Sequence, residues 1–296
     1  MINVIWQTRR NGISILGDET NGQYEYITRV ILKNVKYINY FDNNEYKTFL
    51  DNSIIVHSSP LPEISNDLKT YLQKYKSLNL KYILLHLSNE NLNHNCDYYS
   101  EAEHVFRFYY DEEIKNPNVT TLPLGFVSGY MNTNGDINLS NDRYIPISFI
   151  GQVKSDRGMM VNSIKNINNS FLYLTSKWNC PNGLPIDEVV NIYKRTKFVP
   201  CPKGWVNPDS LRLFEALEWG CIPIIKKYDG VDYFEHIFGK HPIPTVDDWT
   251  EVSDLIDNLN NENLDELILS INKWYIEFMK SISINVGNII KEKLGV

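Results

Sequence analysis

Short apolar runs of strand length alternate with helical stretches along most of this chain, and this alternation limits the fold more than any other feature. In the first half, strands are expected over 4–6, 13–16, 37–40, 53–57 and 81–87. Between the last two, a helix over 64–75 places five apolar residues on one face: Ile64, Leu68, Tyr71, Leu72 and Tyr75. A strand–helix–strand order of this kind is most simply satisfied by a parallel sheet.

The same pattern restarts after a zone rich in Gly and Asn at 130–142. Strands are expected over 147–151, 171–174, 197–201 and 222–225, alternating with helices from about 156, over 186–195 and over 210–219. A long helix over 264–294 follows, with an apolar stripe through Leu264, Leu267, Ile268, Ile271, Trp274 and Phe278. We therefore expect an α/β protein of two Rossmann-like domains, 1–142 and 143–296, facing each other across a cleft.

Composition supports two ordinary globular domains. The 296 residues are 43% hydrophobic and 22% charged, which is enough apolar material for real cores and excludes wholesale disorder. The net charge of -7 argues against a basic surface that coats nucleic acid. The longest apolar runs are too short to span a bilayer, and no basic-then-apolar leader opens the chain. We expect a soluble, cytoplasmic protein with no nucleic-acid partner and no membrane span.

Cysteine spacing gives no framework of bridges or metal ligands. The four cysteines stand at 96, 180, 201 and 221, without a C-x-x-C pair and without a histidine at metal spacing. We therefore expect isolated buried thiols. We expect neither a disulfide scaffold nor a structural zinc site.

The segment 197–225 is the most informative part of the chain. A strand ends at Cys201, a Pro- and Gly-rich loop follows, and Asp209 or Ser210 caps the next helix. The start of that helix then lies at the carboxyl edge of the sheet, where open α/β sheets bind their ligands. Loop amides and the helix dipole favour an anionic group there, such as a diphosphate.

Two side chains of that helix suit a nucleotide. Arg212 lies in the first turn and can reach the same anion, while Glu215, one turn on, can accept hydrogen bonds from a ribose diol. The alternative is an ordinary cap and turn, with Arg212 and Glu215 forming a surface ion pair. The donor-binding residues predicted on this segment are Cys201, Lys203, Gly204, Ser210, Leu211, Arg212 and Glu215.

The segment also resembles a known family. Its C-P-x-G, S-x-R-x-x-E-A-L and G-C-I-P-I-I stretches resemble the signature of exostosin-like, GT47-like glycosyltransferases. The resemblance implies the GT-B fold, with the nucleotide sugar held by the C-terminal domain. That family contains plant cell-wall and viral members, so the resemblance allows a large-DNA-virus source and, in that case, the host cytoplasm as location.

A second segment, 148–157, is similar to the strand–Gly-loop–Arg segment that opens the nucleotide domain of that family. Gly151 lets the backbone turn tightly after the strand, and Lys154 and Arg157 are placed to neutralise a leaving diphosphate. The alternative is a glycine turn with solvated cations.

The N-terminal half is similar to a xylosyltransferase-containing subgroup of the same family, through 84–90, 105–110 and 122–125. The subgroup ends one strand in an acidic pair, which here is Asn89–Glu90, so one carboxylate is missing. The resemblance makes Glu90 the expected general base and places Arg107 and Tyr109 on the acceptor side.

Histidines offer other candidates for the base. His57 and His86 each end an apolar strand and are either alternative bases or core imidazoles, whereas His94 and His104 lie in polar surroundings and are taken as incidental.

No Asp-x-Asp triplet of the kind that holds a divalent metal against a diphosphate occurs in the chain. We therefore expect no metal and no cofactor. The leading hypothesis is an inverting, metal-independent transfer of a sugar, with xylose as first choice, from a UDP-sugar to a hydroxyl of a glycan acceptor. The alternatives are a non-catalytic nucleotide- or sugar-binding module with a degenerate GT-B fold and, more remotely, a glycan phosphorylase. The acceptor, the linkage and the oligomeric state stay open.

Overall fold

The computed structural model describes residues 1–8, 22–42, 45–58, 64–177 and 180–295. The backbone forms two compact units. The first unit comprises Met1–Ser128 together with Met279–Val296, and the second unit comprises Gly129–Phe278. The strand expected over 13–16 lies outside the described residues.

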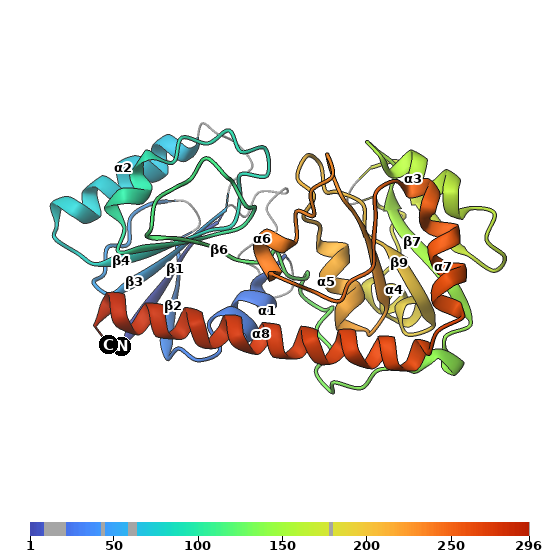
Figure 1. Ribbon diagram of the computed structural model, residues 1–296. Helices are drawn as coiled ribbons and strands as arrows, with labels where there is room; N and C mark the ends of the chain where they lie inside the picture. The colour runs from blue at the N-terminus through green and yellow to red at the C-terminus, as the bar shows by residue number, and fades with distance from the viewer. Residues whose placement is uncertain (9–21, 43–44, 59–63, 178–179, 296) are drawn as a thin grey trace. The chain divides into compact units, whose positions relative to one another are not determined.

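The first unit is built on a six-stranded parallel sheet with the order β2-β1-β3-β4-β5-β6 (Figure 1). Its strands are β1 (Ile2–Thr8), β2 (Tyr37–Phe41), β3 (Ser53–Ser58), β4 (Tyr82–His86), β5 (His104–Arg107) and β6 (Val119–Thr121). Its helical segments are α1 (Tyr24–Tyr26), η1 (Ile27–Ile31), α2 (Ile64–Ser77), η2 (Asp97–Glu101) and the C-terminal part of α8 (Leu264–Leu294).

Side-chain alternation along the strands divides the core of the first unit between two faces of the sheet. One face presents Ile5, Ile55, Leu84 and Val105, which form one buried cluster with Leu68 and Leu72 of α2 and with Tyr98 and Tyr99 of η2. The opposite face is covered by α1 and the end of α8 (Figure 1). Four residues of the α2 stripe that the apolar spacing predicts therefore pack against the sheet: Leu68, Tyr71, Leu72 and Tyr75.

The second unit contains a five-stranded parallel sheet with the order β11-β10-β9-β7-β8. Its strands are β7 (Ile145–Gln152), β8 (Phe171–Thr175), β9 (Thr196–Pro200), β10 (Ile222–Lys226) and β11 (Thr245–Val246). Its helical segments are η3 (Ser140–Asp142), α3 (Arg157–Ile164), α4 (Ile186–Tyr193), α5 (Leu211–Glu218), α6 (Glu235–Phe238), η4 (Trp249–Glu251), α7 (Val252–Asn260) and the first part of α8. Two Rossmann-like parallel sheets confirm the expected α/β fold class.

The units divide at Ser128–Gly129, whereas the sequence favours a boundary between residues 142 and 143. Arg143 explains why the loop before it belongs to the second unit. Its buried guanidinium donates to the carbonyl oxygens of Asn138, Tyr193, Thr196 and Trp219, at 2.7–2.9 Å. These bonds tie the loop to α4, β9 and the end of α5.

The C-terminal helix also departs from the expected division, because α8 is shared between the units. Its last turns bury Val286, Ile290 and Leu294, and Ser283 accepts a hydrogen bond of 2.9 Å from the Asn34 amide in the first unit. The apolar stripe predicts one continuous helix, which is confirmed, but it carries no information about which sheet each turn covers.

All four cysteines have free thiols. Among the helices in the described part of the chain, none has the combination of length and apolar content that crossing a bilayer requires.

Candidate functional site

The order of each sheet identifies where a ligand is expected. In the second unit the chain leaves β7 to form β8 on one side and then returns to form β9 on the other. In open α/β sheets, ligands bind at the carboxyl ends of the strands where the order reverses in this way. The candidate site of the second unit therefore lies beyond Gln152 and Pro200, which end β7 and β9.

Gly151 and Arg212 meet at this point. The Arg212 guanidinium donates a 2.6 Å hydrogen bond to the carbonyl oxygen of Ile150 and lies over the Phe149 ring, with its Cζ 4.5 Å from the ring centroid. A Cβ on residue 151 would lie 2.5 Å from Nη2 of Arg212, and Gly151 has φ +144. Glycine is thus required here both by its backbone conformation and by the approach of the guanidinium.

Arg212 is bonded to the end of β7 and, within the described part of the chain, keeps one unused hydrogen-bond donor. Its buried Nε has no hydrogen-bond partner among the described residues. Ser210 takes the N-cap position of α5 as predicted, but its side chain makes no capping hydrogen bond, and its hydroxyl is likewise buried with no partner in the described structure. The start of α5 therefore presents a cation and an unused hydroxyl group together.

Glu215 lies one turn further along α5 and is half-buried. Burial raises the pKa of its carboxyl group to about 7, and the neighbouring Arg212 charge opposes part of that rise. Burial raises the pKa of the Tyr130 and Tyr193 hydroxyls, and the charge of the same carboxylate adds to the rise at both. Arg212 and Glu215 are both half-buried, and within the described residues the guanidinium donates to a backbone carbonyl and not to the Glu215 carboxylate.

Arg157 braces the loop that follows β9. Its guanidinium donates to the carbonyl oxygen of Lys203 at 2.8 and 3.2 Å and to that of Gln152 at 3.1 Å. Arg157 thus joins the ends of β7 and β9, in addition to any direct role in charge neutralisation.

Tyr228 supports the same loop from the side of β10. Its hydroxyl accepts a hydrogen bond from the Lys203 amide at 3.2 Å and donates to Asp156 at 2.8 Å. The Asp156 carboxylate also accepts a 2.8 Å bond from the Trp249 indole. Three elements therefore fix the position of Lys203 before any ligand binds.

The remaining residues predicted for the donor lie along the same edge. Cys201 is buried and its Sγ donates to the Val199 carbonyl oxygen, and burial raises the pKa of its thiol. Gly204 donates its amide hydrogen to the Asn207 carbonyl oxygen at 2.9 Å, and Leu211 is the first residue of α5. The Lys154 ammonium lies 4.0 Å from the ring centroid of Trp205, an exposed side chain on the loop after β9.

Lys226 belongs to the same edge and is missed by the sequence analysis. It ends β10, and its ammonium lies 5.4 Å from the Tyr228 ring centroid, while that of Lys203 lies 5.7 Å from it. Its position as the last residue of an apolar strand was the available signal. The carboxyl edge of the second sheet therefore collects five cations: Lys154, Arg157, Lys203, Arg212 and Lys226.

In the first unit, the corresponding edge of the sheet is lined by buried polar residues. Its order reverses between β1 and β3, and an in-register row of polar residues runs across the strand ends there: Gln7 on β1, His57 on β3, His86 on β4 and Arg107 on β5. All four are fully buried and point to the face that α2 covers. The sequence analysis selects three of them singly, and the structure brings them together.

Burial disfavours the charged form of both histidines in this row. Burial lowers the pKa of His57 to about 3, with His94 adding to the effect, and neither ring nitrogen of His57 has a hydrogen-bond partner among the described residues. Burial also lowers the pKa of His86 far below its usual range. His86 is bonded through Nδ1 to the Tyr99 hydroxyl at 2.5 Å and through Nε2 to the Ser88 hydroxyl at 3.1 Å. His94, which the sequence analysis takes as incidental, is buried, and its ring stacks on His86 with centroids 5.5 Å apart.

Glu90 lies half-buried in the turn that follows β4. Asn89 shapes that turn. It has φ +82, and its side-chain oxygen accepts hydrogen bonds from the amides of Asn93 and His94 at 2.8 and 3.0 Å. The amide side chain therefore serves the loop that carries Glu90.

The predicted acceptor-side residues lie at and just beyond the end of β5: Arg107 is its last residue, and Tyr109 lies two positions further on. The Arg107 guanidinium pairs with Asp111 at 3.4 Å, and its Nη2 is buried with no hydrogen-bond partner in the described part of the chain. Tyr109 is half-buried and adopts φ +62. His104, on the same strand, faces the other side of the sheet and donates to or accepts from Thr120 at 2.9 Å.

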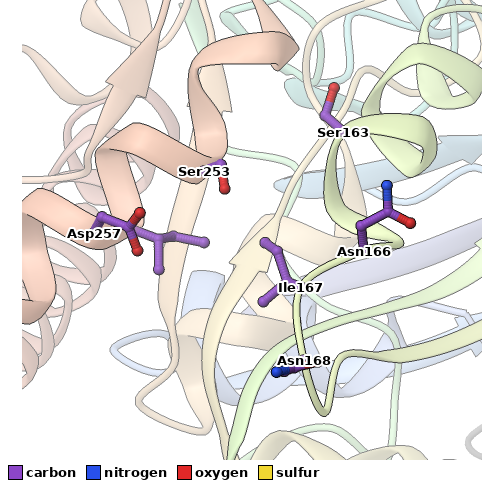
Figure 2. A pocket seen from close by; sticks show the side chains of 7 residues that line it. Ser163, Asn166, Ile167, Asn168, Ser253 and Asp257 are labelled. Atoms are coloured by element: carbon purple, nitrogen blue, oxygen red, sulfur yellow. The ribbon is translucent and has the colours of Figure 1, made fainter.

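Two further features bear on the search for a site. Across the residues that the structure describes, no three His, Cys, Asp or Glu side chains gather closely enough to hold a metal ion. A hollow lies between the connection that follows α3 and helix α7, lined by Ser163, Asn166, Ile167, Asn168, Ser253, Ile256 and Asp257 (Figure 2). None of the predicted residues lines it.

Comparison with known proteins places the fold. No protein-family model matches the chain, and no curated protein sequence matches it significantly. Among solved structures, an α1,3-fucosyltransferase shares 13% identity, covers 96% of this chain and 90% of its own, and gives a TM-score of 0.54. Anabaena HepE with UDP-glucose shares 7% identity over 99% of this chain and 100% of its own, with a TM-score of 0.58. HepE with UDP shares 9% identity over 99% of both chains, with a TM-score of 0.55.

The chain has the GT-B fold. At these identities the similarity is one of fold, and it agrees with the two parallel sheets of six and five strands. The fold class that the sequence predicts is thereby confirmed.

Proposed function

We propose that this protein is a glycosyltransferase that uses a nucleotide sugar, with the donor on the second unit and the acceptor on the first. One observation carries the proposal: Arg212 lies against Gly151 at the strand ends where the second sheet reverses, with Glu215 one turn along the same helix. This arrangement offers positive charge to a diphosphate and a carboxylate to a ribose diol. Support comes from HepE, a protein of similar fold whose structures hold UDP and UDP-glucose.

Cations at the second edge suit the departure of the leaving group. As the bond between the anomeric carbon and the diphosphate oxygen breaks, negative charge develops on that oxygen. Fixed positive charge stabilises it most when the groups are already in place, as the braced loop after β9 provides. We propose that these cations and the start of α5 perform this role without a metal ion, so activity should survive chelation by EDTA.

The general base proposed is Glu90. An inverting transfer needs one group to take the proton of the acceptor hydroxyl as the oxygen attacks the anomeric carbon from the side opposite the leaving diphosphate. A base works best when its pKa lies near the working pH. Burial lowers the pKa of His57 to about 3 and that of His86 well below its usual range, and His86 already uses both ring nitrogens. These facts favour the carboxylate of Glu90 over either histidine.

The finer assignments rest on the resemblance to exostosin-like enzymes. It favours a UDP-linked donor, and the similarity of the N-terminal half to the xylosyltransferase-containing subgroup makes UDP-xylose the first donor to test. The alternative, a non-catalytic binding module, is favoured by Asn89, since the amide that replaces the second acid serves the loop.

A donor panel separates the two functions. The protein is incubated with UDP-xylose, UDP-glucuronate, UDP-galactose and UDP-N-acetylglucosamine, with a GDP-sugar as control, and release of the nucleoside diphosphate is measured. We expect slow release from one UDP-sugar and an increase when a suitable glycan is added. Glu90→Gln should lower turnover by about 10²–10⁴-fold while donor affinity stays near that of the wild type. Binding of UDP without release from any donor would support the binding module instead.

A further inference from the structure

Tyr228 lies two residues beyond Lys226, the last residue of β10, and its ring is held at both ends. On the backbone side, the amide of Tyr228 donates to the Val231 carbonyl oxygen and the amide of Val231 donates back to that of Tyr228, each at 3.0 Å. On the ring side, the hydroxyl accepts the 3.2 Å bond from the Lys203 amide and donates the 2.8 Å bond to Asp156. The position of the ring is therefore fixed by contacts that lie entirely within the second unit.

Two ammonium groups lie close to this ring. That of Lys226 is 5.4 Å from the ring centroid, and that of Lys203, on the loop after β9, is 5.7 Å from it. Neither lysine forms an ion pair with an acidic side chain of the described residues. Hydrogen bonds from Thr250 lower the pKa of Asp248, and the Lys226 charge adds to that effect without pairing with the carboxylate. Because the two like charges on one ring repel each other, an anion between them would stabilise the lysine–tyrosine cluster of Lys203, Lys226 and Tyr228.

We propose that Tyr228 is a positioning residue that presents the ammonium groups of Lys203 and Lys226 together to one phosphate group. The face of an aromatic ring attracts a cation, so this ring limits the freedom of two long and flexible side chains. Lysine binds phosphate as a point charge, and two such charges suit a doubly charged phosphate group. The binding of such an anion rests on the contacts of the lysine–tyrosine cluster alone. Its assignment to the diphosphate of a sugar donor rests on the proposed function, so the two claims can be tested apart.

Calorimetric titration of the full chain with inorganic pyrophosphate tests the cluster, because this probe carries the phosphate groups without a nucleoside. Tyr228→Leu removes the ring, so the ammonium groups must be ordered when the anion binds. We expect this variant to bind pyrophosphate and UDP about 5- to 30-fold more weakly, the change in affinity that two exposed cation–π contacts correspond to, with uridine binding unchanged.

Two further variants complete the titration. Tyr228→Phe keeps the ring and should retain most of the affinity for pyrophosphate. Tyr173→Leu is the matched control, because Tyr173 is also half-buried and its hydroxyl also bonds to a loop, at the Asn182 carbonyl oxygen, but it lies on β8 and outside the cluster. The control should bind pyrophosphate as the wild type does, and an equal loss in it would contradict the assignment to Tyr228.

A double-mutant cycle separates a positioning role from mere support of the loop, since groups that act through one another have non-additive effects. Lys203→Met/Lys226→Met should itself weaken pyrophosphate binding by about tenfold or more, and adding Tyr228→Leu to it should weaken the binding no further. A further loss in that background, or an equal loss of uridine affinity in Tyr228→Leu, would show that Tyr228 only supports the loop and would overturn the proposal. If Tyr228→Leu does not fold, Tyr228→Met takes its place in the cycle.

The same titrations distinguish this proposal from the proposed function. A wild type that binds no pyrophosphate, or undiminished binding in Lys203→Met/Lys226→Met, would overturn the anion site. Pyrophosphate binding that depends on both lysines, without release of a nucleoside diphosphate from any sugar donor, would support the anion site and refute the proposed function.

Discussion

Replacing Glu215 by Gln should stabilise the free protein above neutral pH while weakening its binding of UDP. Burial raises the pKa of this carboxyl group from its ordinary 4.5 to about 7. Between those two values the folded chain holds a proton that the unfolded chain releases, so the free energy of unfolding falls as the pH rises from about 4.5 to 7. A glutamine does not titrate, so it removes this dependence.

The size of the effect follows from the same shift. A rise in pKa from 4.5 to about 7 corresponds to at most ~3 kcal/mol of destabilisation at high pH. Because Glu215 is half-buried and solvent screens part of its charge, we expect a gain of about 1–2 kcal/mol for Glu215→Gln at pH 8 and little change at pH 4.5. Loss of a charged hydrogen bond to the ribose should weaken UDP binding by about 1–3 kcal/mol.

Urea unfolding at pH 4.5, 6 and 8 measures the first effect, and calorimetric titration with UDP measures the second. Glu277→Gln is the matched control, because Glu277 is an exposed carboxylate on α8 in the same unit. The control should change neither the pH dependence of stability nor UDP affinity.

A carboxylate that is buried in order to bind UDP should give higher stability but lower UDP affinity when it is replaced by Gln, whereas a structural carboxylate should not. If Glu215→Gln destabilises the protein at pH 8, the carboxylate is held by favourable contacts and the reasoning from burial is wrong. If stability rises as expected but UDP affinity does not change, Glu215 does not contact the nucleotide.

Three other outcomes follow from the structure. Burial lowers the pKa of His57 to about 3 and that of His104 to about 4. Below pH 6.5 the unfolded chain therefore binds protons at these histidines that the folded chain does not bind, so the free energy of unfolding should fall as the pH drops below about 6.5. Urea midpoints across pH 4–7 should show a shallower fall in His57→Leu than in wild type, and an unchanged slope would contradict this. Arg143→Met should lower the free energy of unfolding by about 3 kcal/mol or more, because several buried carbonyl oxygens lose their donor; a wild-type urea midpoint would exclude that anchoring role. Gly151→Ala should displace the Arg212 guanidinium and weaken UDP binding, measured by calorimetry, by about tenfold or more, since a charged hydrogen bond contributes about 1.5–3 kcal/mol. Unchanged UDP affinity in this variant would show that Gly151 is not part of the UDP site.

Periodicity in the sequence predicts local elements well, because the apolar face of each is set by its own residues. The helix expected over 264–294 has the bounds of α8, and the strand expected over 53–57 is β3 less its last residue. The donor segment was also readable, since its strand, Gly- and Pro-rich loop and helix are contiguous, and the structure brings Gly151 against Arg212 across the two predicted segments.

Long-range contacts were beyond the sequence. The division at Ser128 depends on Arg143 and Asn132 reaching residues more than fifty positions away, and no local pattern reveals those partners. The row of His57, His86 and Arg107 depends on strand register, which pairs residues from separate strands. The bonds from Arg157 to backbone carbonyls were hidden for the same reason, because a sequence does not show which acceptors surround a cation.

The most direct test of a nucleotide-sugar site at the start of α5 is calorimetric titration of wild type and Arg212→Ala with UDP and with uridine. Arg212 is placed to meet a diphosphate and not a nucleoside. The account predicts that Arg212→Ala weakens UDP binding by about 10- to 100-fold, the range for a lost charged hydrogen bond, and leaves uridine binding nearly unchanged. Equal losses for the two ligands, or no binding of UDP by the wild type, would contradict it.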